Sequence, residues 1–374
     1  MSGAGHAHHL IRRRQLVVVA GAALVLALAV FSLTVGPFDI STGRVLAILF
    51  SAGNPAGTAA TGTAGTAGDV ISTAAGTAGD AAAAVVWGIR FPRALLAVFA
   101  GGGLALAGAV MQGVFRNPLA DPGIIGVSAG GAVGAVSALV LAGRFVTPAV
   151  LEHLALWLAP AAALAGACAA TALIYRLSLR RGQVDVPAML LCGIAVNAAS
   201  GAFIGLVNAL VATAEEVQTL AFWTLGSLGR ATWELLAAGA LFLVPPLVAL
   251  PFHARALNAL ALGEEDAAML GVNVPRVKRA LIALSCSLTG ATVALCGMLG
   301  FVPLVAPHIA RLALGADHRL LLPASALAGA ALLLAADMTA RVIVAPAELP
   351  VGIVTSLLGA PVFLSLIAKR RAAR

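Results

Sequence analysis

The feature that most constrains this chain is the stretch from residue 90 to residue 134, where two long apolar runs flank a short break. The first run follows the arginine pair Arg90 and Arg93, and the second begins near residue 124. Each run can cross a bilayer, which takes about 20 apolar residues. Pro118 and Pro122 interrupt the chain between the runs, because proline does not continue a helix. The stretch therefore predicts two membrane-spanning helices joined by a shaped loop.

Composition extends this prediction to the whole chain. Hydrophobic residues make up 61% and charged residues 10%, and the mean hydropathy is +1.02, whereas soluble domains carry about 25% charged residues. We therefore expect an all-α membrane protein with about ten transmembrane helices, in which lipid is the solvent for much of the surface. The expected spans are 15–36, 93–115, 124–143, 150–177, 188–212, 231–251, 275–298, 302–315, 320–340 and 351–368, of which 302–315 is short.

The basic residues predict the orientation of these spans. With the N-terminus inside, 17 of the 23 basic residues lie on the cytoplasmic side and six lie outside, as the positive-inside rule requires. The six are Arg44, Arg90, Arg93, Arg144, Arg230 and Arg341. This predicts a multi-pass protein of the cytoplasmic (inner) membrane, with cytoplasmic tails at 1–14 and 369–374 around a permease domain at 15–368. The first span lacks a small-residue cleavage pattern, so we expect it to be retained. Because membrane topology explains the excess of basic residues, we expect no nucleic-acid partner.

Two segments outside the spans differ in character. Residues 51–84 are rich in Gly, Ala and Thr and repeat AGTAGD, which predicts a flexible external insertion without chemistry of its own. The cytoplasmic loop at 252–276 predicts a short helix: Gly263 breaks the chain, acids follow from Glu264, and Gly271 is a natural C′ residue. This helix carries Met269 and Leu270. It is either an ordinary connector or a knob that docks in the groove of a partner.

The sequence lacks the usual constellations of an enzyme. Neither lysine follows a glycine, so a phosphate loop is missing, and no Cys/His pair has metal spacing. The four cysteines fall in apolar runs and are expected to be small core residues. We expect no catalytic residue, no bound metal and no cofactor.

Two polar features lie inside predicted spans. Asp337 is the one acid well inside a span, and Arg341 follows four residues later on the same helical face. Either the two residues pair, or Arg341 faces an external partner. In the fifth span, Asn197 and Asn208 share a 120° arc with three glycines, and Ser200 lies nearby. That face serves either tight packing or a polar translocation pathway.

The chain resembles the FecCD-type permease subunits of ABC importers for ferric siderophores, haem and vitamin B12, from about residue 85 to residue 368. The motifs that carry this resemblance are RFPR at 90–93, QGVFRNPLADPGIIGVSAGG at 112–131, FWTLGSLGRATW at 222–233, LGEEDAAMLGV at 262–272, GFVPLVAPHIAR at 300–311 and the stretch 322–363. The resemblance implies ten helices per subunit, a homodimer around a central pathway, two cytoplasmic ATPase subunits that use ATP and Mg, and an extracytoplasmic substrate-binding protein.

The resemblance also implies residue roles. Arg90, Arg93 and Arg341 look like the external arginines that receive acidic side chains of the binding protein. The coupling element seated in the ATPase matches Gly263, Glu264, Ala267, Met269, Leu270 and Gly271. The cytoplasmic gate matches Asn117, Pro118 and Leu119, with Val186 and Pro187 in the loop before the fifth span as its companion. Asn197, Ser200 and Asn208 are the candidates for lining the pathway.

The substrate is a finer question. FWTLGSLGRATW and ARALNALALGEE look most like haem permeases, so haem is the first choice, with a ferric siderophore a close second and vitamin B12 the next alternative. From another class, an ion-coupled secondary transporter is the main rival, and the scarcity of intramembrane acids weighs against it.

Overall fold

The computed structural model of the protein describes residues 3–50, 78–145, 148–180, 183–210, 213–345 and 347–372. In this part of the chain nearly all regular structure is helical. The elements are α1 (Gly3–Ser32), α2 (Thr42–Phe50), α5 (Ala78–Val85), the π-helical turn η1 (Val86–Arg90), α6 (Phe91–Val114), the 3₁₀ turn η2 (Pro122–Ile125), α7 (Val127–Phe145), α8 (Pro148–Leu177), β1 (Leu179–Arg180), β2 (Gln183–Val184), α9 (Val186–Leu210), α10 (Ala214–Leu225), α11 (Trp233–Phe252), α12 (Ala254–Leu262), α13 (Glu264–Met269), α14 (Val274–Cys296), α15 (Val302–Leu314), α16 (His318–Val342) and α17 (Val351–Ala372).

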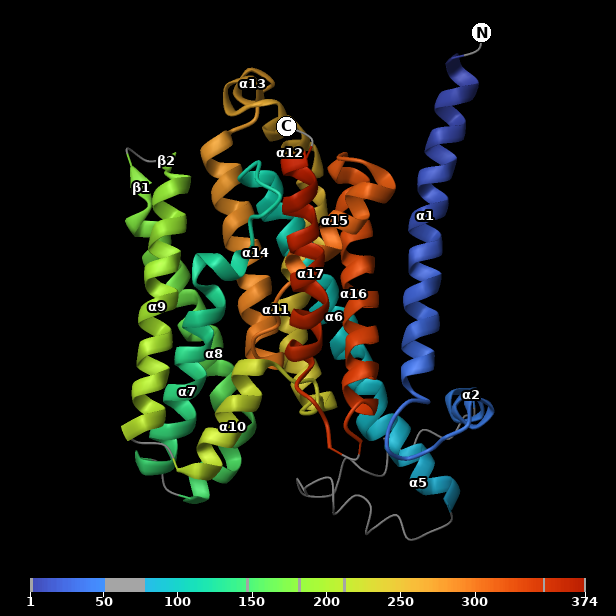
Figure 1. Cartoon of the computed structure of the whole chain (residues 1–374), viewed down its shortest axis with the longest axis vertical. Coiled ribbons are helices and arrows are strands. Elements are labelled where there is room, and N and C mark those ends of the chain that lie inside the picture. Colours follow the sequence, from blue (N-terminus) through green and yellow to red (C-terminus); the bar gives the residue numbers. More distant parts are fainter. Residues whose placement is uncertain are drawn as a thin grey trace.

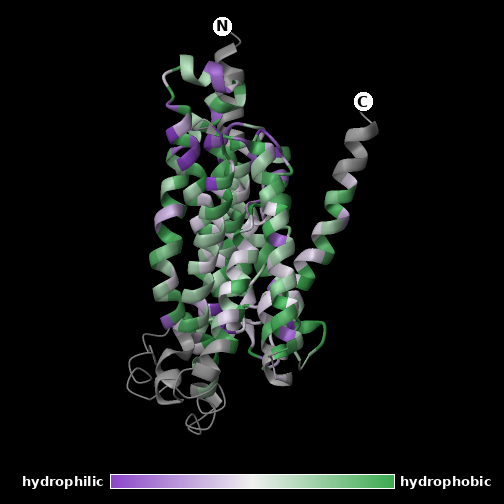
Figure 2. Ribbon diagram, turned by 90° about the vertical axis from the view of Figure 1, so that its left-hand side faces the viewer, coloured by the Kyte–Doolittle hydropathy of each residue, from purple (hydrophilic) through white to green (hydrophobic). Residues whose placement is uncertain are grey.

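The helices form a bundle of the expected kind. Seven described helices are long and apolar enough to span a membrane, and three shorter apolar helices add to them at 127–140, 302–314 and 351–365. All ten coincide with the predicted spans, and the span near 302–315 is short, as expected. Figure 2 shows hydrophobic residues along the middle of the bundle and hydrophilic residues gathered toward its two ends. The all-α membrane fold is therefore confirmed.

The two ends of the bundle differ in what they carry. The helix α13 protrudes from one end, where α1 begins and α17 finishes, and α2, α5 and α10 lie at the other end (Figure 1). We refer to them as the α13 end and the α5 end. The two-stranded antiparallel pair β1–β2, in which Leu179 pairs with Val184, also lies at the α13 end (Figure 1). The helix α1 packs mainly on α16.

Small residues hold the centre of the bundle together. The helices α6 and α16 pack closely, as do α7 and α8. A Cβ atom on Gly101 of α6 would overlap the carbonyl of Gly329 on α16, and one on Gly130 of α7 would overlap the carbonyl of Gly166 on α8. In a membrane, such close approach of backbones supplies the packing that the hydrophobic effect does not provide between helices.

The structure corrects several predicted boundaries. The predicted tails are partly helical, since α1 begins at Gly3 and α17 extends to Ala372. The second span begins earlier than residue 93, because α5 and η1 lead into α6 without a break. Residues 78–84 of the predicted flexible insertion are helical within α5, where an alanine-rich sequence favours helix. Residues 51–77 of that insertion lie outside the described part of the chain. The short helices α2, α10 and α12 were not predicted.

Candidate functional site

Five charged residues lie together at the α5 end, and we call them the ionic cluster: ion pairs join Arg93, Asp337, Arg341 and Glu348, and Arg90 borders the same cavity. Asp337 lies at its centre and is fully buried. The Arg93 Nη2 atom lies 2.9 Å from Asp337 Oδ1, and the Arg341 Nη2 atom lies 2.9 Å from Asp337 Oδ2. One carboxylate therefore bridges two guanidinium groups, with a hydrogen bond from Arg93 to Oδ1 and an ion pair without a hydrogen bond from Arg341 to Oδ2.

Glu348 completes the cluster from the segment before α17. The Arg93 Nη1 atom donates to both carboxylate oxygens of Glu348, at 3.0 and 2.8 Å. The segment itself is held against α16, because the Leu349 backbone N–H donates to the Ala340 carbonyl. The Glu348 side chain is 37% exposed, in contrast to the buried Asp337. Arg93 therefore has one fixed partner and one partner at the surface.

The other two arginines also hold backbone groups near the end of α1. Arg341 Nη1 donates to the carbonyl oxygens of Ser32 and Val35 at 3.1 and 2.9 Å. Arg90 donates to the carbonyl oxygens of Leu33 and Phe38. These bonds satisfy the carbonyl of Ser32 at the end of α1 and three carbonyls of the connection that follows it. The arginines thus fasten the connection between α1 and α2 to α6 and α16.

These positions change the expectation drawn from the sequence. The predicted docking arginines were expected to face a partner, but the side chains of Arg90, Arg93 and Arg341 are buried, with residue exposures of 4 to 5%. The alternative that Asp337 holds Arg341 is confirmed by their ion pair. The pairing of Arg93 with Asp337 was missed, because 244 residues separate them and no local pattern links them. The arginines are not closed off completely, since all three line a cavity of about 320 Å³ together with Glu348.

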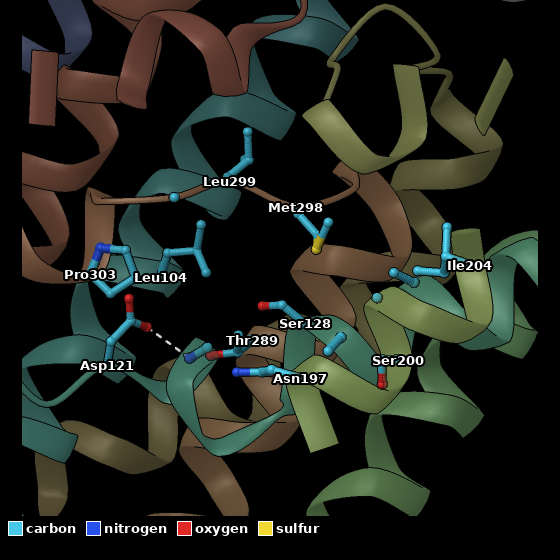
Figure 3. A pocket seen from close by; sticks show the side chains of 15 residues that line it. Leu104, Asp121, Ser128, Asn197, Ser200, Ile204, Thr289, Met298, Leu299 and Pro303 are labelled. Atoms are coloured by element: carbon cyan, nitrogen blue, oxygen red, sulfur yellow. Dashed lines mark hydrogen bonds between the residues drawn. The ribbon is translucent and has the colours of Figure 1, made fainter. Parts of the chain in front are cut away.

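A second, central cavity of about 400 Å³ lies among α6, α7, α9, α14 and the segment before α15. Its polar lining residues are Asp121, Ser128, Asn197, Ser200 and Thr289. In Figure 3, Ser128, Thr289 and Asn197 gather in the lower part of the view, and Met298 and Leu299 lie in the upper part. Asn197 and Ser200 thus line one cavity. Asn208 does not line this cavity, and its Oδ1 atom has no hydrogen-bond partner among the described residues.

Three polar members of this cavity, Asp121, Ser128 and Thr289, were missed by sequence reasoning. Asp121 begins η2, where its Oδ1 accepts the Gly123 backbone N–H at 2.7 Å. Thr289 is almost fully buried, and its hydroxyl has no hydrogen-bond partner in the described part of the chain. A buried hydroxyl without a partner is costly unless water or a ligand satisfies it. The sequence held a signal for Asp121, in the position of an acid between two spans, but none for Thr289.

The predicted gate residues lie in two different kinds of structure. Asn117, Pro118 and Leu119 form a half-buried turn after α6, in which the Asn117 side chain accepts the Leu119 backbone N–H at 3.0 Å. The expectation that Val186 and Pro187 belong to a loop is wrong, because they are the first two residues of α9. Asp185 caps this helix by accepting the Ala188 backbone N–H at 3.2 Å. Proline fits the first turn of a helix, where its missing N–H costs nothing.

The short helix expected after Gly263 is confirmed as α13. Both flanking glycines adopt positive φ, 144° at Gly263 and 85° at Gly271. The buried Ala267 anchors the helix on the bundle, and Lys278 of α14 pairs with Glu264 at 2.8 Å. Met269 and Leu270 are 87% and 65% exposed at the tip. Two apolar side chains that project from the end of a bundle are typical of a docking surface.

A polar junction that the sequence did not reveal ties α12 to the start of α16. The Asn258 amide nitrogen donates to Asp317 Oδ1 at 2.7 Å, and Asn258 Oδ1 accepts the His318 backbone N–H at 2.9 Å. The hydrogen bond from Asn258 also lowers the pKa of Asp317, because it stabilises the carboxylate. The region that carries α13 is therefore linked to α16, whose other end holds Asp337.

Comparison with known proteins supports this architecture. The chain is 46% identical over 290 residues to the haemin transport system permease protein of Yersinia pestis, covering 77% of this chain and 85% of the relative. It is 43% identical to the cobalamin import system permease protein of Halobacterium salinarum, covering 76% and 74% of the two chains. It is 41% identical to the vitamin B12 import system permease protein of Escherichia coli, covering 76% and 84%.

A solved structure agrees with the relatives. The fold superposes with a TM-score of 0.77 on an inward-facing ABC transporter described as of metal-chelate type, with 29% identity and coverage of 95% of this chain and 99% of that chain. A model of the FecCD transport family matches residues 23–369. This chain therefore belongs to the FecCD transport family.

Proposed function

We propose that this chain imports haem as the permease subunit of an ABC importer. As a permease of this family it is a transport subunit and not an enzyme, and partner ATPases supply the energy. The single observation that carries the transport function is the family match over residues 23–369. For haem, the support is the 46% identity to a haemin permease, together with the apolar side chains of Leu104, Met298 and Leu299 on the wall of the central cavity.

Assembly with two further kinds of subunit follows from the same proposal. The exposed tip of α13, at Met269 and Leu270, seats in a groove of the ATPase, with Gly263, Glu264, Ala267 and Gly271 setting its shape. This places the α13 end and both termini in the cytoplasm, in agreement with the positive-inside rule. The substrate-binding protein then docks at the α5 end, where an acidic side chain enters the cavity lined by Arg90, Arg93 and Arg341.

We further propose that two copies of the chain surround the pathway. The helix α9 is the supporting evidence, because it exposes the apolar residues Leu191, Ile194, Leu206 and Leu210 while also carrying polar ones. A polar side chain such as Asn208 is costly against lipid but is satisfied by water in a pathway between subunits. Asn197, Ser200 and Asn208 then line this pathway. The turn at Asn117–Leu119 and the first turn of α9, with Val186 and Pro187, form its cytoplasmic gate.

Transport by reconstituted complexes tests this proposal. Proteoliposomes that contain the permease, its ATPase and the binding protein should take up haem when ATP is supplied, and neither a ferric siderophore nor cobalamin at a comparable rate. Uptake of one of the other two would replace haem as the substrate while keeping the importer. Uptake that follows an imposed proton or sodium gradient without ATP would instead show an ion-coupled transporter.

A further inference from the structure

The surface partner of Arg93 is the observation from which we start. Arg93 contacts Asp337 through Nε and Nη2, and these bonds are buried. Its third nitrogen, Nη1, is held by Glu348 alone among the ion pairs of the described residues. Glu348 is 37% exposed and lies in the segment between α16 and α17. Of the two carboxylates on Arg93, only Glu348 can leave without opening the core of the bundle.

We propose that Glu348 is an internal substitute for the acidic side chain of the binding protein. In the undocked permease it occupies the Nη1 position of Arg93, and docking replaces one carboxylate with another. We call this contact the Glu348 latch. The proposal rests on the docking role of the arginines described above, and it adds the residue that regulates their availability.

The space around the latch fits such an exchange. The cavity of about 320 Å³ is bordered by Arg90, Arg93, Arg341 and Glu348, and by apolar groups that include Phe38 and Ile89. A displaced Glu348 would move toward solvent, while an incoming carboxylate would enter a site that already holds three guanidinium groups. Apolar walls strengthen such a pair, since they exclude water from one side.

Charge within the cluster also favours exchange. Three guanidinium groups face two carboxylates, Asp337 and Glu348, so the loss of Glu348 without replacement leaves Arg93 poorly compensated. The nearby Asp39 is exposed and its charge acts on Arg90, but it forms no ion pair with Arg93 or Arg341 among the described residues. Replacement by another carboxylate restores the balance. The latch therefore protects Arg93 before docking, and it lowers the net affinity for the partner because one pair must break before another forms.

Binding measurements test the latch. The permease–ATPase complex in lipid nanodiscs is titrated with the substrate-binding protein of the importer, with the permease as wild type, Glu348→Gln or Glu234→Gln. Glu234 is a matched control, because it is an exposed acid at the start of α11, at the same end of the bundle. Glu348→Gln should tighten binding about two- to fivefold, the range of a part-exposed ion pair, and Glu234→Gln should leave it unchanged.

The gain must also depend on the carboxylates of the partner. When the docking acids of the binding protein are changed to Gln, the advantage of Glu348→Gln should disappear. Unchanged or weaker binding by Glu348→Gln to the unaltered partner would overturn the latch. If neither the wild-type complex nor any variant binds the binding protein, the proposed docking role of the arginines is rejected. The chemical modification described next then tests the latch by itself.

Chemical modification examines the latch without the binding protein. Phenylglyoxal reacts with accessible guanidinium groups, and mass spectrometry locates the modified arginines. In the full-length permease, Arg93 should be modified faster in Glu348→Gln than in wild type or Glu234→Gln, while Arg341 should stay equally protected in all three. Equal rates at Arg93 would show that Glu348 does not shield it, and the latch would be rejected.

Discussion

Replacement of Asp337 by Asn should destabilise the protein far more than replacement of Glu348 by Gln. Asp337 is fully buried and pairs with two arginines, each at 2.9 Å. Asn keeps the shape and removes the charge, so two buried guanidinium groups lose their shared carboxylate. Breaking a buried ion pair costs about 3–5 kcal/mol, because a buried charge is left uncompensated. The half-exposed Glu348 pair should cost about 1 kcal/mol or less.

The loss of stability in Asp337→Asn should lie near the lower limit of about 3–5 kcal/mol, because both arginines keep other partners. Arg93 keeps Glu348, and Arg341 keeps the carbonyl groups of Ser32 and Val35. A double variant, Asp337→Asn with Arg341→Met, should recover part of the loss, since one unpaired charge is then removed along with its partner.

Thermal unfolding of the purified permease in one detergent, followed by fluorescence, measures all four proteins under the same conditions. From the highest to the lowest unfolding temperature, the expected order is wild type, Glu348→Gln, the double variant and then Asp337→Asn. An Asp337→Asn protein that unfolds at the wild-type temperature would refute the reasoning. So would a Glu348→Gln protein that loses as much stability as Asp337→Asn, because burial would then not decide the strength of these pairs.

Three further variants test other parts of the structure. Gly108→Ala should lower the free energy of unfolding by about 1–3 kcal/mol, as overpacking does, because the added Cβ would overlap the Pro303 backbone. Gly201→Ala is the control and should be tolerated, since no atom lies within 4 Å of the Cβ that it adds. Equal unfolding temperatures of the two variants would contradict this prediction. Met269→Asp should weaken ATPase association and reduce ATP-driven uptake without loss of folded permease, and normal co-purification with normal uptake would remove α13 as the docking element. Asn258→Ala should preserve ATPase association yet lower uptake per ATP hydrolysed, because α12 loses its bonds to α16; an unchanged ratio of uptake to hydrolysis would show that the junction is only structural.

The sequence by itself determined which segments cross the membrane. Lipid offers no hydrogen bonds, so each crossing must be a helix of sufficient apolar length, and that requirement is visible in a single sequence. An apolar helix is therefore present at each of the ten predicted positions, and seven of these helices are long enough to span a membrane. The sequence also predicted where helices begin and end. The glycines at 263 and 271 flank α13, and the prolines at 118 and 122 lie in the break after α6.

The sequence did not reveal which charged side chains are buried or which residues they pair with. Arg90, Arg93 and Arg341 were interpreted as surface residues, because a charge at a membrane edge can face either water or another charge. Only the packing of α6 against α16 brings Arg93 to Asp337, and only the segment before α17 brings Glu348 to the same group. Sequence position carries no information about a contact over 244 residues.

The central cavity shows the same division. Helical periodicity placed Asn197 and Asn208 on one polar face of the predicted fifth span, with Ser200 nearby, and left open whether that face serves packing or a pathway. In the structure, Asn197 and Ser200 line the central cavity. Thr289 of α14 and Asp121 before η2 join them only because the helices cross at that level. Hydrophobic length fixes the number of helices, but in lipid many neighbours are equally apolar. The choice among them depends on close packing of small residues and on pairing of buried charges, and both exist only in the folded bundle.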